Sequence, residues 1–397
     1  MIYILTKGNI MNNQFIETNR ISYWQNIKNS FIGAILGLIL FIASFVLLWW
    51  NEGNRINLTK NEDFIIENTI ILQSDSAKRK NDDKLVMING SVVAKETLSD
   101  SILSVDNALN LKRTVEMYQW VETKTKTTSH NNMGGSTTNT TTYLYQKKWD
   151  NKEHNSDNFK RTEYKNPKFT FKDKIISASG ASMGNFKIMQ SQVSKIEAYQ
   201  PINRLNHIDN YKVVDNYYYK GKNPSQPQIG DIRISYSYVP SGALVSIIGR
   251  QNDDNTISEM NTKSGSVYLQ YDGHLTFDDM IAKYKHSNNL LTYIFRFTGW
   301  IVMTTGLMLL FNPITTIAKF IPLLSTVINY ISNFILICVS LVLSLLTIAI
   351  AWITHRPLVA IGLFAVVFLI VYYIKQRLKK QSSAAGQQTV DKNIPII

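Results

Sequence analysis

The sequence predicts an α+β membrane protein in which four transmembrane helices, one N-terminal and three C-terminal, enclose a β-rich extracytoplasmic domain. Two observations carry this prediction. An uncharged apolar run at residues 31–50 and further apolar runs after residue 289 are long enough to cross a bilayer. Between them, residues 51–289 are polar and contain stretches in which β-branched and aromatic residues alternate with polar ones, as is typical of strands.

Residues 1–30 are predicted to form a cytosolic N-terminal segment, and residues 31–50 the first transmembrane helix. The twenty residues FIGAILGLILFIASFVLLWW rise about 1.5 Å each and so match a hydrocarbon core of about 30 Å. The run is longer than the apolar part of a usual signal peptide and lacks a small-residue cleavage site. It is therefore expected to remain in the protein as an anchor.

This first helix carries a packing face and an interfacial end. Gly33 and Gly37 lie four positions apart, so they share one face, where another helix can approach the backbone closely. Trp49 and Trp50 have the side chains that favour the boundary between lipid and water. We predict helix packing at the two glycines and a membrane-interface position for the two tryptophans.

Residues 51–289 are predicted to be the β-rich extracytoplasmic domain, with a long antiparallel hairpin as its clearest element. Its arms are residues 111–121 and 138–149, and it turns near Gly134 and Gly135. Alternation in the first arm places Val115, Met117 and Val121 on one side and Tyr118 and Trp120 on the other.

Another strand and two helical pieces are expected further along this domain. In DIRISYSYV one face carries Ile232, Ile234, Tyr236 and Tyr238. Helical pieces are predicted at residues 186–199 and 277–284, the second with Asp278 and Asp279 in its first turn.

The C-terminal region is predicted to contain three more spans. They are helices at residues 290–311, 331–353 and 358–374, with a loop and interfacial segment at 312–330 and a basic cytosolic tail at 375–397. Asn312 and Pro313 are expected to end the first of them. Four spans place both termini on one side, and Lys375 and Arg377 in the tail place that side in the cytosol. Residues 51–289 then lie across the membrane from both termini.

Two arginines lie near predicted ends of these spans. Arg296 follows the start of the second span and Arg356 lies in the turn before the fourth, and both are predicted to reach the membrane interface. The spans contain no acidic residue, whereas conduction usually needs ionisable groups deep in a helix bundle. A channel or transporter component therefore remains an alternative without a specific residue to support it.

Composition excludes several kinds of site. The net charge of +13 comes from dispersed Lys and Arg residues, so nucleic acid is not an expected partner. Cys338 is the sole cysteine, which excludes an intrachain disulfide and a thiolate metal site. The six histidines lack metal-ligand spacing. No catalytic, cofactor-binding or metal-binding residue is assigned, and the chain is not expected to be an enzyme.

The enzymatic alternative rests on the stretch GASMG around Ser182. It matches the G-x-S-x-G nucleophile elbow, provided that a strand precedes it and a helix follows. Asp231 and His274 are then the partners suggested by chain order. This reading gives a membrane-anchored serine hydrolase; the alternative for the stretch is a tight turn of small residues.

Several stretches together resemble the transmembrane protein 43 family, also called LUMA. In chain order they include SFVLLWWNEGN, LKRTVEMYQWVET, YQKKWD, GDIRISYSYV, NTKSG, FRFTGW, GLMLLFNP and AWITHRPL. The resemblance implies one anchor, a large extracytoplasmic domain and a group of C-terminal helices. It supplies no catalytic residue.

The prediction from sequence is an integral membrane scaffold or sensor that organises membrane protein complexes through self-association and an extracytoplasmic binding domain. Its expected partners are the lipid bilayer, other membrane proteins and further copies of itself. The family resemblance implies the endoplasmic reticulum and inner nuclear membrane, with a role in nuclear membrane organisation, for a eukaryotic chain. For a bacterial chain the expected location is the cytoplasmic membrane.

Overall fold

The computed structural model describes residues 13–75, 77–130, 136–318, 322–355 and 372. They form two compact units. The sheet unit contains the described parts of residues 1–33, 57–290 and 311–330, and the helix unit those of residues 34–56, 291–310 and 331–397.

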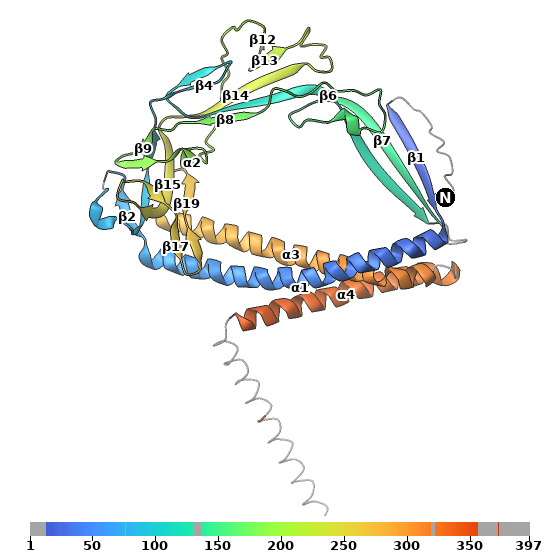
Figure 1. Ribbon diagram of the computed structural model, residues 1–397. Helices are drawn as coiled ribbons and strands as arrows, with labels where there is room; N and C mark the ends of the chain where they lie inside the picture. Colours follow the sequence, from blue (N-terminus) through green and yellow to red (C-terminus); the bar gives the residue numbers. More distant parts are fainter. Residues whose placement is uncertain (1–12, 76, 131–135, 319–321, 356–371, 373–397) are drawn as a thin grey trace, which may run out of the picture. The chain divides into compact units, whose positions relative to one another are not determined.

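The larger sheet of the sheet unit has eight strands in the order β1-β7-β6-β14-β13-β12, with β11 beside β14 and β8 beside β6 (Figure 1). Its strands are β1 (Gln14–Ile21), β6 (Ala108–His130), β7 (Thr137–Asp150), β8 (Lys174–Ser177), β11 (Gln200–Pro201), β12 (Lys212–Val214), β13 (Tyr217–Lys220) and β14 (Ile232–Pro240).

Strands β6 and β7 form the predicted hairpin. They pair antiparallel from Met117 with Asp150 to His130 with Thr137, so the hairpin is confirmed, while its predicted turn at Gly134 and Gly135 lies outside the described residues. The predicted alternation holds, because one face is buried and the other half-buried. The buried side chains are Val115, Met117 and Val121, and the half-buried ones Tyr118 and Trp120.

Strand β1 is an element that the sequence did not predict. Residues 14–21, assigned above to a cytosolic segment, pair antiparallel with β7, from Gln14 with Leu144 to Ile21 with Thr137. Ser22 then caps the first helix, because its hydroxyl accepts the N–H of Gln25 at 3.3 Å.

The second sheet has seven strands in the order β10-β9-β3-β15-β16, with β19 beside β15 and β2 beside β3. Its strands are β2 (Ile70–Gln73), β3 (Leu85–Val93), β9 (Ala181–Met183), β10 (Phe186–Ile188), β15 (Ala243–Gln251), β16 (Ile257–Ser258) and β19 (Leu269–Asp272). Two further strand pairs are β4 (Thr97–Ser99) with β5 (Ser104–Asp106), and β17 (Met260–Thr262) with β18 (Gly265–Val267).

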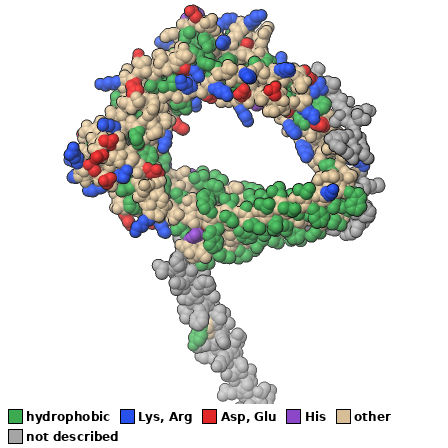
Figure 2. All heavy atoms as spheres, in the orientation of Figure 1, with side chains coloured by type: hydrophobic (Ala, Val, Ile, Leu, Met, Phe, Trp, Pro, Cys, Tyr) green, Lys and Arg blue, Asp and Glu red, His purple; other side chains and the backbone are tan. Residues whose placement is uncertain are grey.

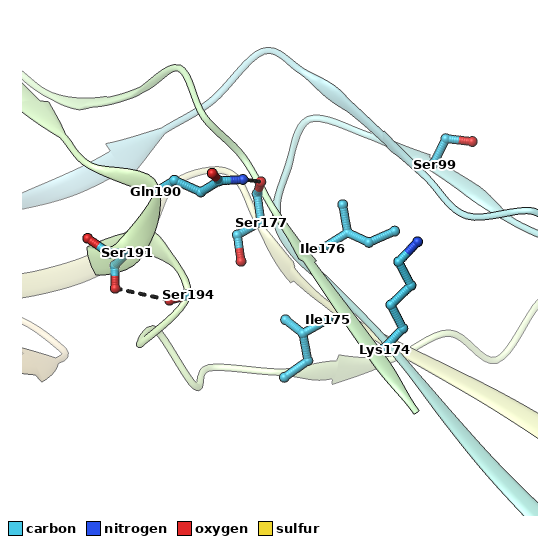
Figure 3. A pocket seen from close by; sticks show the side chains of 8 residues that line it. All are labelled: Ser99, Lys174, Ile175, Ile176, Ser177, Gln190, Ser191 and Ser194. Atoms are coloured by element: carbon cyan, nitrogen blue, oxygen red, sulfur yellow. Dashed lines mark hydrogen bonds between the residues drawn. The ribbon is translucent and has the colours of Figure 1, made fainter. Parts of the chain in front are cut away.

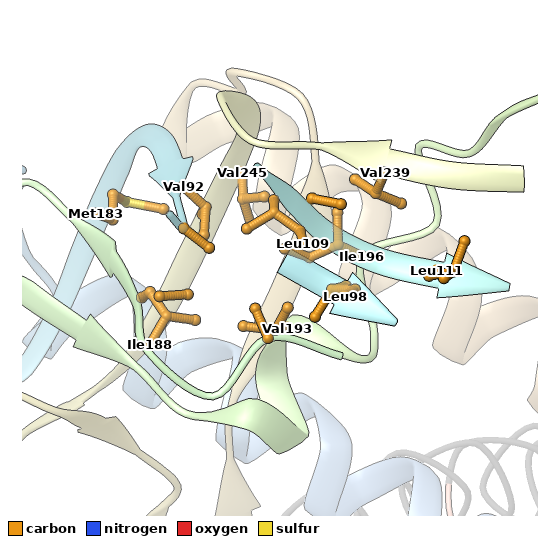
Figure 4. Close-up of a cluster of buried hydrophobic side chains, with 14 of the residues drawn as sticks. Val92, Leu98, Leu109, Leu111, Met183, Ile188, Val193, Ile196, Val239 and Val245 are labelled. Carbon is orange, nitrogen blue, oxygen red and sulfur yellow. The ribbon is translucent and has the colours of Figure 1, made fainter. Parts of the chain in front are cut away.

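The main hydrophobic core joins residues of both sheets (Figure 4). Leu109 and Leu111 of β6 and Val239 of β14 contribute from the larger sheet, and Val92 and Val245 from the smaller one. Burying an aliphatic side chain of this size stabilises a fold by about 1.5–3 kcal/mol. The face of β14 predicted to be apolar is the one that enters this core.

Strand β3 is buried on both faces. Val86 and Ile88 belong to the main core, whereas Leu85 and Met87 face a second, smaller core. The other buried members of the second core are Ile65, Ile248, Val267, Leu269 and Met280.

The helices are α1 (Tyr23–Asn68), α2 (Gln190–Val193), α3 (Phe277–Ala318) and α4 (Pro322–Thr354), with short 3-10 turns at Arg79–Asn81 and Ser156–Asn158. Within the described residues, α1, α3 and α4 are the three helices long and apolar enough to cross a membrane. They contain the predicted spans 31–50, 290–311 and 331–353 but extend beyond them. The predicted fourth span, 358–374, lies outside the described residues except for Tyr372, and the tail, 375–397, lies outside them entirely.

Two helix predictions need correction. Helix α3 continues past Asn312 and Pro313, so the predicted loop and interfacial segment at 312–330 is helical at both ends. Next to this proline, Asn312 accepts hydrogen bonds from hydroxyl groups of the next turn, at 3.0 Å from Thr315 to its carbonyl oxygen.

The helix predicted at 186–199 is mostly absent. The chain forms β10 and then a single helical turn, α2, because a turn at Gly184 folds β10 back onto β9. The φ of Gly184 is 56°, and a Cβ there would meet Ser74 O at 2.3 Å, so the turn requires glycine. The helical start at 277 is confirmed, with Asp279 accepting the Thr276 hydroxyl at 2.7 Å.

Candidate functional site

The helix unit contains a buried ion pair between α1 and α3. Arg296 binds Glu52 through two hydrogen bonds, Nε to Oε1 at 2.7 Å and NH2 to Oε2 at 2.8 Å. The Glu52 side chain is 1% exposed and that of Arg296 is 30% exposed. Two parallel bonds between a guanidinium and a carboxylate form the strongest and most directional ion pair that side chains make.

Polar and aromatic contacts surround this pair. Asn51 donates its side-chain N–H to the carbonyl oxygen of Thr292 at 3.3 Å. The rings of Trp50 and Phe295 meet edge to face at 5.7 Å between centroids. Asn51 and Trp50 therefore bind α3 on the same stretch as the ion pair. We call Glu52, Arg296, Asn51 and Thr292 the polar lock.

Helix α4 reaches the same end of α1. The His355 ring, directly after α4, lies 5.7 Å from that of Trp49, and a Cβ at Gly53 would be 3.0 Å from His355 Nε2. Gly53 therefore provides room for the histidine ring.

The apolar stretches of the helix unit that the structure describes contain no charged side chains. Residues 34–50, 297–310 and 333–354 contain no Asp, Glu, Lys or Arg. An unpaired ion in this apolar setting is expensive, so the two charges of the polar lock stabilise each other and tie α1 to α3 at one end.

Glycines bring α1 and α3 together further along. A Cβ on Gly37 would lie 2.7 Å from Gly306 O, and one on Gly306 would lie 2.7 Å from Phe41 N. A Cβ on Gly299 would lie 2.5 Å from the Leu48 side chain. The two backbones are thus in direct contact, as small residues permit in membrane helices.

Helix α4 is joined to α3 by a hydrogen bond between hydroxyl groups, 2.7 Å from Thr304 to Ser340. The outward surfaces are apolar, and Figure 2 shows hydrophobic side chains over the visible face of the helices. Ile35, Ile42 and Val46 of α1 are all exposed. The helix unit therefore has small and polar residues among its buried ones and an apolar outer surface.

The predicted site residues have different outcomes. Gly37 is buried against α3, Gly33 is half-buried, and Trp49 and Trp50 are 41% and 53% exposed. Arg296 is bound by Glu52, and its position at the membrane interface stays a prediction. The remaining interface residues, Arg356, Lys375 and Arg377, lie outside the described residues.

Sequence reasoning missed Glu52 as the partner of Arg296. Glu52 follows the tryptophans and was treated as the return to water. The available signal was Arg296 itself, because an arginine between two phenylalanines in an apolar run needs a carboxylate or a route to water.

The hydrolase alternative lacks the geometry that it requires. Ser182 is the middle residue of β9 and pairs with Val93 and Lys187, so its context is strand, turn and strand, without the helix of a nucleophile elbow. Ser182 belongs to the seven-stranded sheet, whereas Asp231 directly precedes β14 of the other sheet. The Asp231 carboxylate accepts the hydroxyl of Tyr219 and the N–H of Gln228.

A shallow hollow of about 560 Å³ lies elsewhere on the sheet unit (Figure 3). Its lining is Ser99, Lys174, Ile175, Ile176, Ser177, Gln190, Ser191 and Ser194. Gln190 donates to the Ser177 carbonyl oxygen at 2.8 Å, and Ser194 to that of Ser191 at 3.0 Å, so these groups serve the local backbone. Among the described residues no group of His, Cys, Asp and Glu side chains could hold a metal ion.

A sequence profile described as Transmembrane protein 43 matches residues 117–357, more than half of the chain. The chain belongs to the transmembrane protein 43 family. It is 30% identical to Transmembrane protein 43 of Mus musculus over 371 residues, covering 88% of this chain and 91% of the relative. The human protein is 29% identical over 350 residues, covering 83% and 86%, and the Drosophila melanogaster homolog 25% over 338, covering 82% and 89%.

No solved structure gives a significant match. The part of the chain matched by the transmembrane protein 43 profile begins within β6 and ends just after α4. It therefore includes Arg296, Gly306 and Ser340, the α3 and α4 partners described above, whereas Glu52 and Gly37 of α1 precede it.

Proposed function

We propose that this member of the transmembrane protein 43 family is a membrane scaffold that associates with copies of itself and with other membrane proteins. The observation that carries the proposal is the polar lock. A bidentate ion pair at one end, with glycine contacts along the helices, fixes α1 against α3 and leaves their apolar outer faces available to lipid or to other membrane helices.

The distribution of charged side chains supports a scaffold better than a channel or transporter. The charged groups of the polar lock lie beside the tryptophans at one end of the apolar stretch, and they bind each other. A transporter instead needs ionisable groups at the depth of its substrate path. The sheet unit adds a large surface for a protein partner on the aqueous side.

For a eukaryotic chain we propose the endoplasmic reticulum and inner nuclear membrane as the location, with a role in nuclear membrane organisation, and for a bacterial chain the cytoplasmic membrane. The family resemblance motivates the eukaryotic location. Fluorescence of the tagged full-length chain beside markers of each membrane checks it.

Self-association can be tested with two differently tagged copies in one membrane. We expect one tag to recover the other copy after solubilisation in mild detergent. Gly37→Leu should reduce recovery, because it separates α1 from α3 and disturbs the surface presented to a second copy.

Ala43→Leu is the matched control, because Ala43 is exposed on the same helix and receives the same side chain. It adds the same side chain without separating α1 from α3, so it should reduce recovery less than Gly37→Leu does. Failure of either tag to recover the other copy at equal expression would reject self-association, and the scaffold proposal with it.

A further inference from the structure

Strand β8 is an edge strand of the larger sheet, and all four of its residues line the hollow of about 560 Å³ (Figure 3). Among the described residues it pairs only with β6, from Asn110 with Ser177 to Arg113 with Lys174. The same stretch of β6 pairs with β14 on its other side. The outer side of β8, away from β6, therefore carries no strand.

The register of β8 decides which of its backbone groups face this outer side. The N–H of Ala178 donates to the carbonyl oxygen of Leu109 at 2.9 Å. Hydrogen-bonded pairs recur at every second residue of an antiparallel ladder, so the even-numbered residues of β8 bond to β6. The odd-numbered residues, Ile175 and Ser177, therefore direct their N–H and C=O groups away from β6.

Most of these outward groups are free to bind a partner. The Ser177 carbonyl oxygen accepts the side-chain N–H of Gln190 at 2.8 Å. Within the described part of the chain, the N–H and C=O of Ile175 and the N–H of Ser177 have no hydrogen-bonding partner. Ile175 is 52% exposed. The outer side of β8 is thus an open edge to which another strand can add.

Lysines lie on both faces of the sheet at this edge. Lys174 is exposed and forms no ion pair with any described residue. Lys112 of β6 is directly opposite Ile175 and so lies on the other face. Its ammonium is 5.4 Å from the centre of the Tyr199 ring. The open edge therefore has a positive charge on each face.

The two carboxylates next to residues that line the hollow are bound within the fold. Asp173 directly precedes β8, and its Oδ1 accepts the N–H of Val115 at 2.7 Å. Asp100 follows Ser99, and its side chain is 3% exposed and binds Arg113. The lysines are thus left to attract a negatively charged partner from outside.

Charge alone would suit a nucleic acid or a lipid surface as well as a peptide. Backbone N–H and C=O groups at strand spacing, however, are matched by a partner that carries the same groups at the same spacing, which is an extended peptide. Directly opposite residues of neighbouring strands have Cβ atoms about 4.5–5.5 Å apart. An acidic residue of the peptide opposite Lys174 is therefore within reach of its ammonium.

We infer that β8 binds an extended acidic peptide segment of another protein, which adds to the larger sheet as one more strand. Backbone groups of the segment bond to Ile175, and an Asp or Glu side chain pairs with Lys174. The inference rests on the proposed scaffold function, because it names the surface and the chemistry with which the sheet unit takes a protein partner.

A defined peptide tests the inference on the full-length protein in lipid nanodiscs. The probe is a capped, fluorescently labelled peptide in which Val and Glu alternate, and fluorescence anisotropy measures its binding. We expect saturable binding that weakens as salt is added. The matched control is the same peptide methylated on every backbone nitrogen, which keeps its charge but removes its donors. Absence of saturable binding, or equal binding of the methylated peptide, would overturn the inference.

A pair of variants tests the backbone edge. Ile175→Pro removes the outward N–H and leaves the bonds to β6, because that N–H is not part of the ladder. Ile175→Ala is the matched control, since it also loses the side chain but keeps the N–H. We expect the proline variant to bind about threefold to tenfold more weakly than the alanine variant, as for one lost hydrogen bond. Equal binding by two variants of native unfolding temperature would overturn the inference.

A second pair of variants tests the charge. Lys174→Met should weaken binding about twofold to fivefold, as for one exposed ion pair. Lys126→Met, at an exposed position of β6 outside the part paired with β8, is the matched control and should leave binding unchanged. Stronger binding to Lys174→Met would mean that this lysine guards the edge against other strands, and would overturn the inference.

The recovery of differently tagged copies separates this inference from the scaffold proposal. Ile175→Pro should leave that recovery unchanged, because self-association is assigned to the helices. If the copies recover each other and the peptide does not bind, the inference fails and the scaffold proposal stands. If the peptide binds and the copies do not recover each other, the peptide site stands and the scaffold proposal fails.

Discussion

The two units of this protein are stabilised by opposite choices of side chain. The sheet unit buries large residues, among them Phe186, Tyr145 and Tyr218. The helix unit places small or hydroxyl-bearing residues between its helices, such as Gly37, Ser44 and Ser340, and exposes most of its large apolar ones. Water drives large apolar groups together, whereas lipid does not, so close contact replaces apolar burial in the helix unit.

Each unit also contains a buried ion pair, and the two differ in their surroundings. In the sheet unit, Arg113 binds Asp100 at 2.6 Å, while the Tyr236 hydroxyl and the Ser101 N–H donate to the same carboxylate. The Glu52 carboxylate of the helix unit depends on Arg296 for the contacts described above. Loss of one partner should therefore be more harmful in the helix unit.

The largest effect is expected from Arg296→Met. Removing one partner of a buried pair typically costs about 3–5 kcal/mol, because the other charge is left uncompensated. Glu52→Gln should cost less, since Arg296 is partly exposed and can reach water. The double variant should recover part of the loss. Thermal unfolding of the full-length protein in lipid nanodiscs measures this, and a double variant worse than Arg296→Met would contradict the polar lock.

The next largest loss of stability is expected from truncating one of two equally buried leucines, one in each unit. Leu109 of the sheet unit and Leu48 of the helix unit are both 0% exposed. Leu109→Ala should cost about 2–5 kcal/mol through lost burial and a cavity. Leu48→Ala should cost less, because lipid also solvates an apolar side chain, so that mainly the cavity left beside Gly299 destabilises the fold. Equal losses in the same nanodisc assay would mean that the units share one source of stability.

Adding volume between the helices should also destabilise the helix unit. Gly37→Leu is expected to cost about 1–3 kcal/mol by overpacking against the Gly306 backbone, while Ala43→Leu, which faces outward, should be nearly neutral. Cysteine crosslinking between α1 and α3 reports their separation. A double variant with Gly33→Leu tests the whole predicted glycine face, and crosslinking as efficient as that of the native protein would place the packing face elsewhere.

Acid sensitivity should be the smallest effect and should arise in the sheet unit. Burial works to raise the pKa of Asp100, but the Ser101 N–H, the Tyr236 hydroxyl and Arg113 outweigh it and hold that pKa below its usual range. The resulting stability is therefore present above about pH 4, the usual pKa of an unfolded aspartate, and is lost as the pH falls through the lower folded value. Asp100→Asn should flatten the fall in unfolding temperature between pH 5 and pH 3.

The sequence alone predicted those elements whose residue pattern is complete within a short stretch of the chain. The β6–β7 hairpin was predictable because Val115 to Val121 alternate and a glycine-containing loop follows, and the apolar stretch of α1 because its length matches a bilayer. The three-residue strands β9 and β10 were not, since residues 186–199 also fit a helical period and only pairing with β3 decides between them.

The candidate site was predictable only in part. The spacing of Gly33 and Gly37 pointed to packing, but their partner could have been any helix. Arg296 and Glu52 are far apart in the chain, so their pairing depends on how α1 meets α3. The strand β1 was hidden for the same reason, because its partner lies beyond an entire helix.

Strand β3 has a consequence for how the sheet unit opens. Val86 and Ile88 hold one core while Leu85 and Met87 hold the other, which contains Ile65 of α1 and Met280 of α3. Neither core can lose this strand without exposing the other, so both should protect their amide hydrogens from exchange as a single cooperative block. A force applied along α1 or α3 would then have to unfold both cores of the sheet unit together.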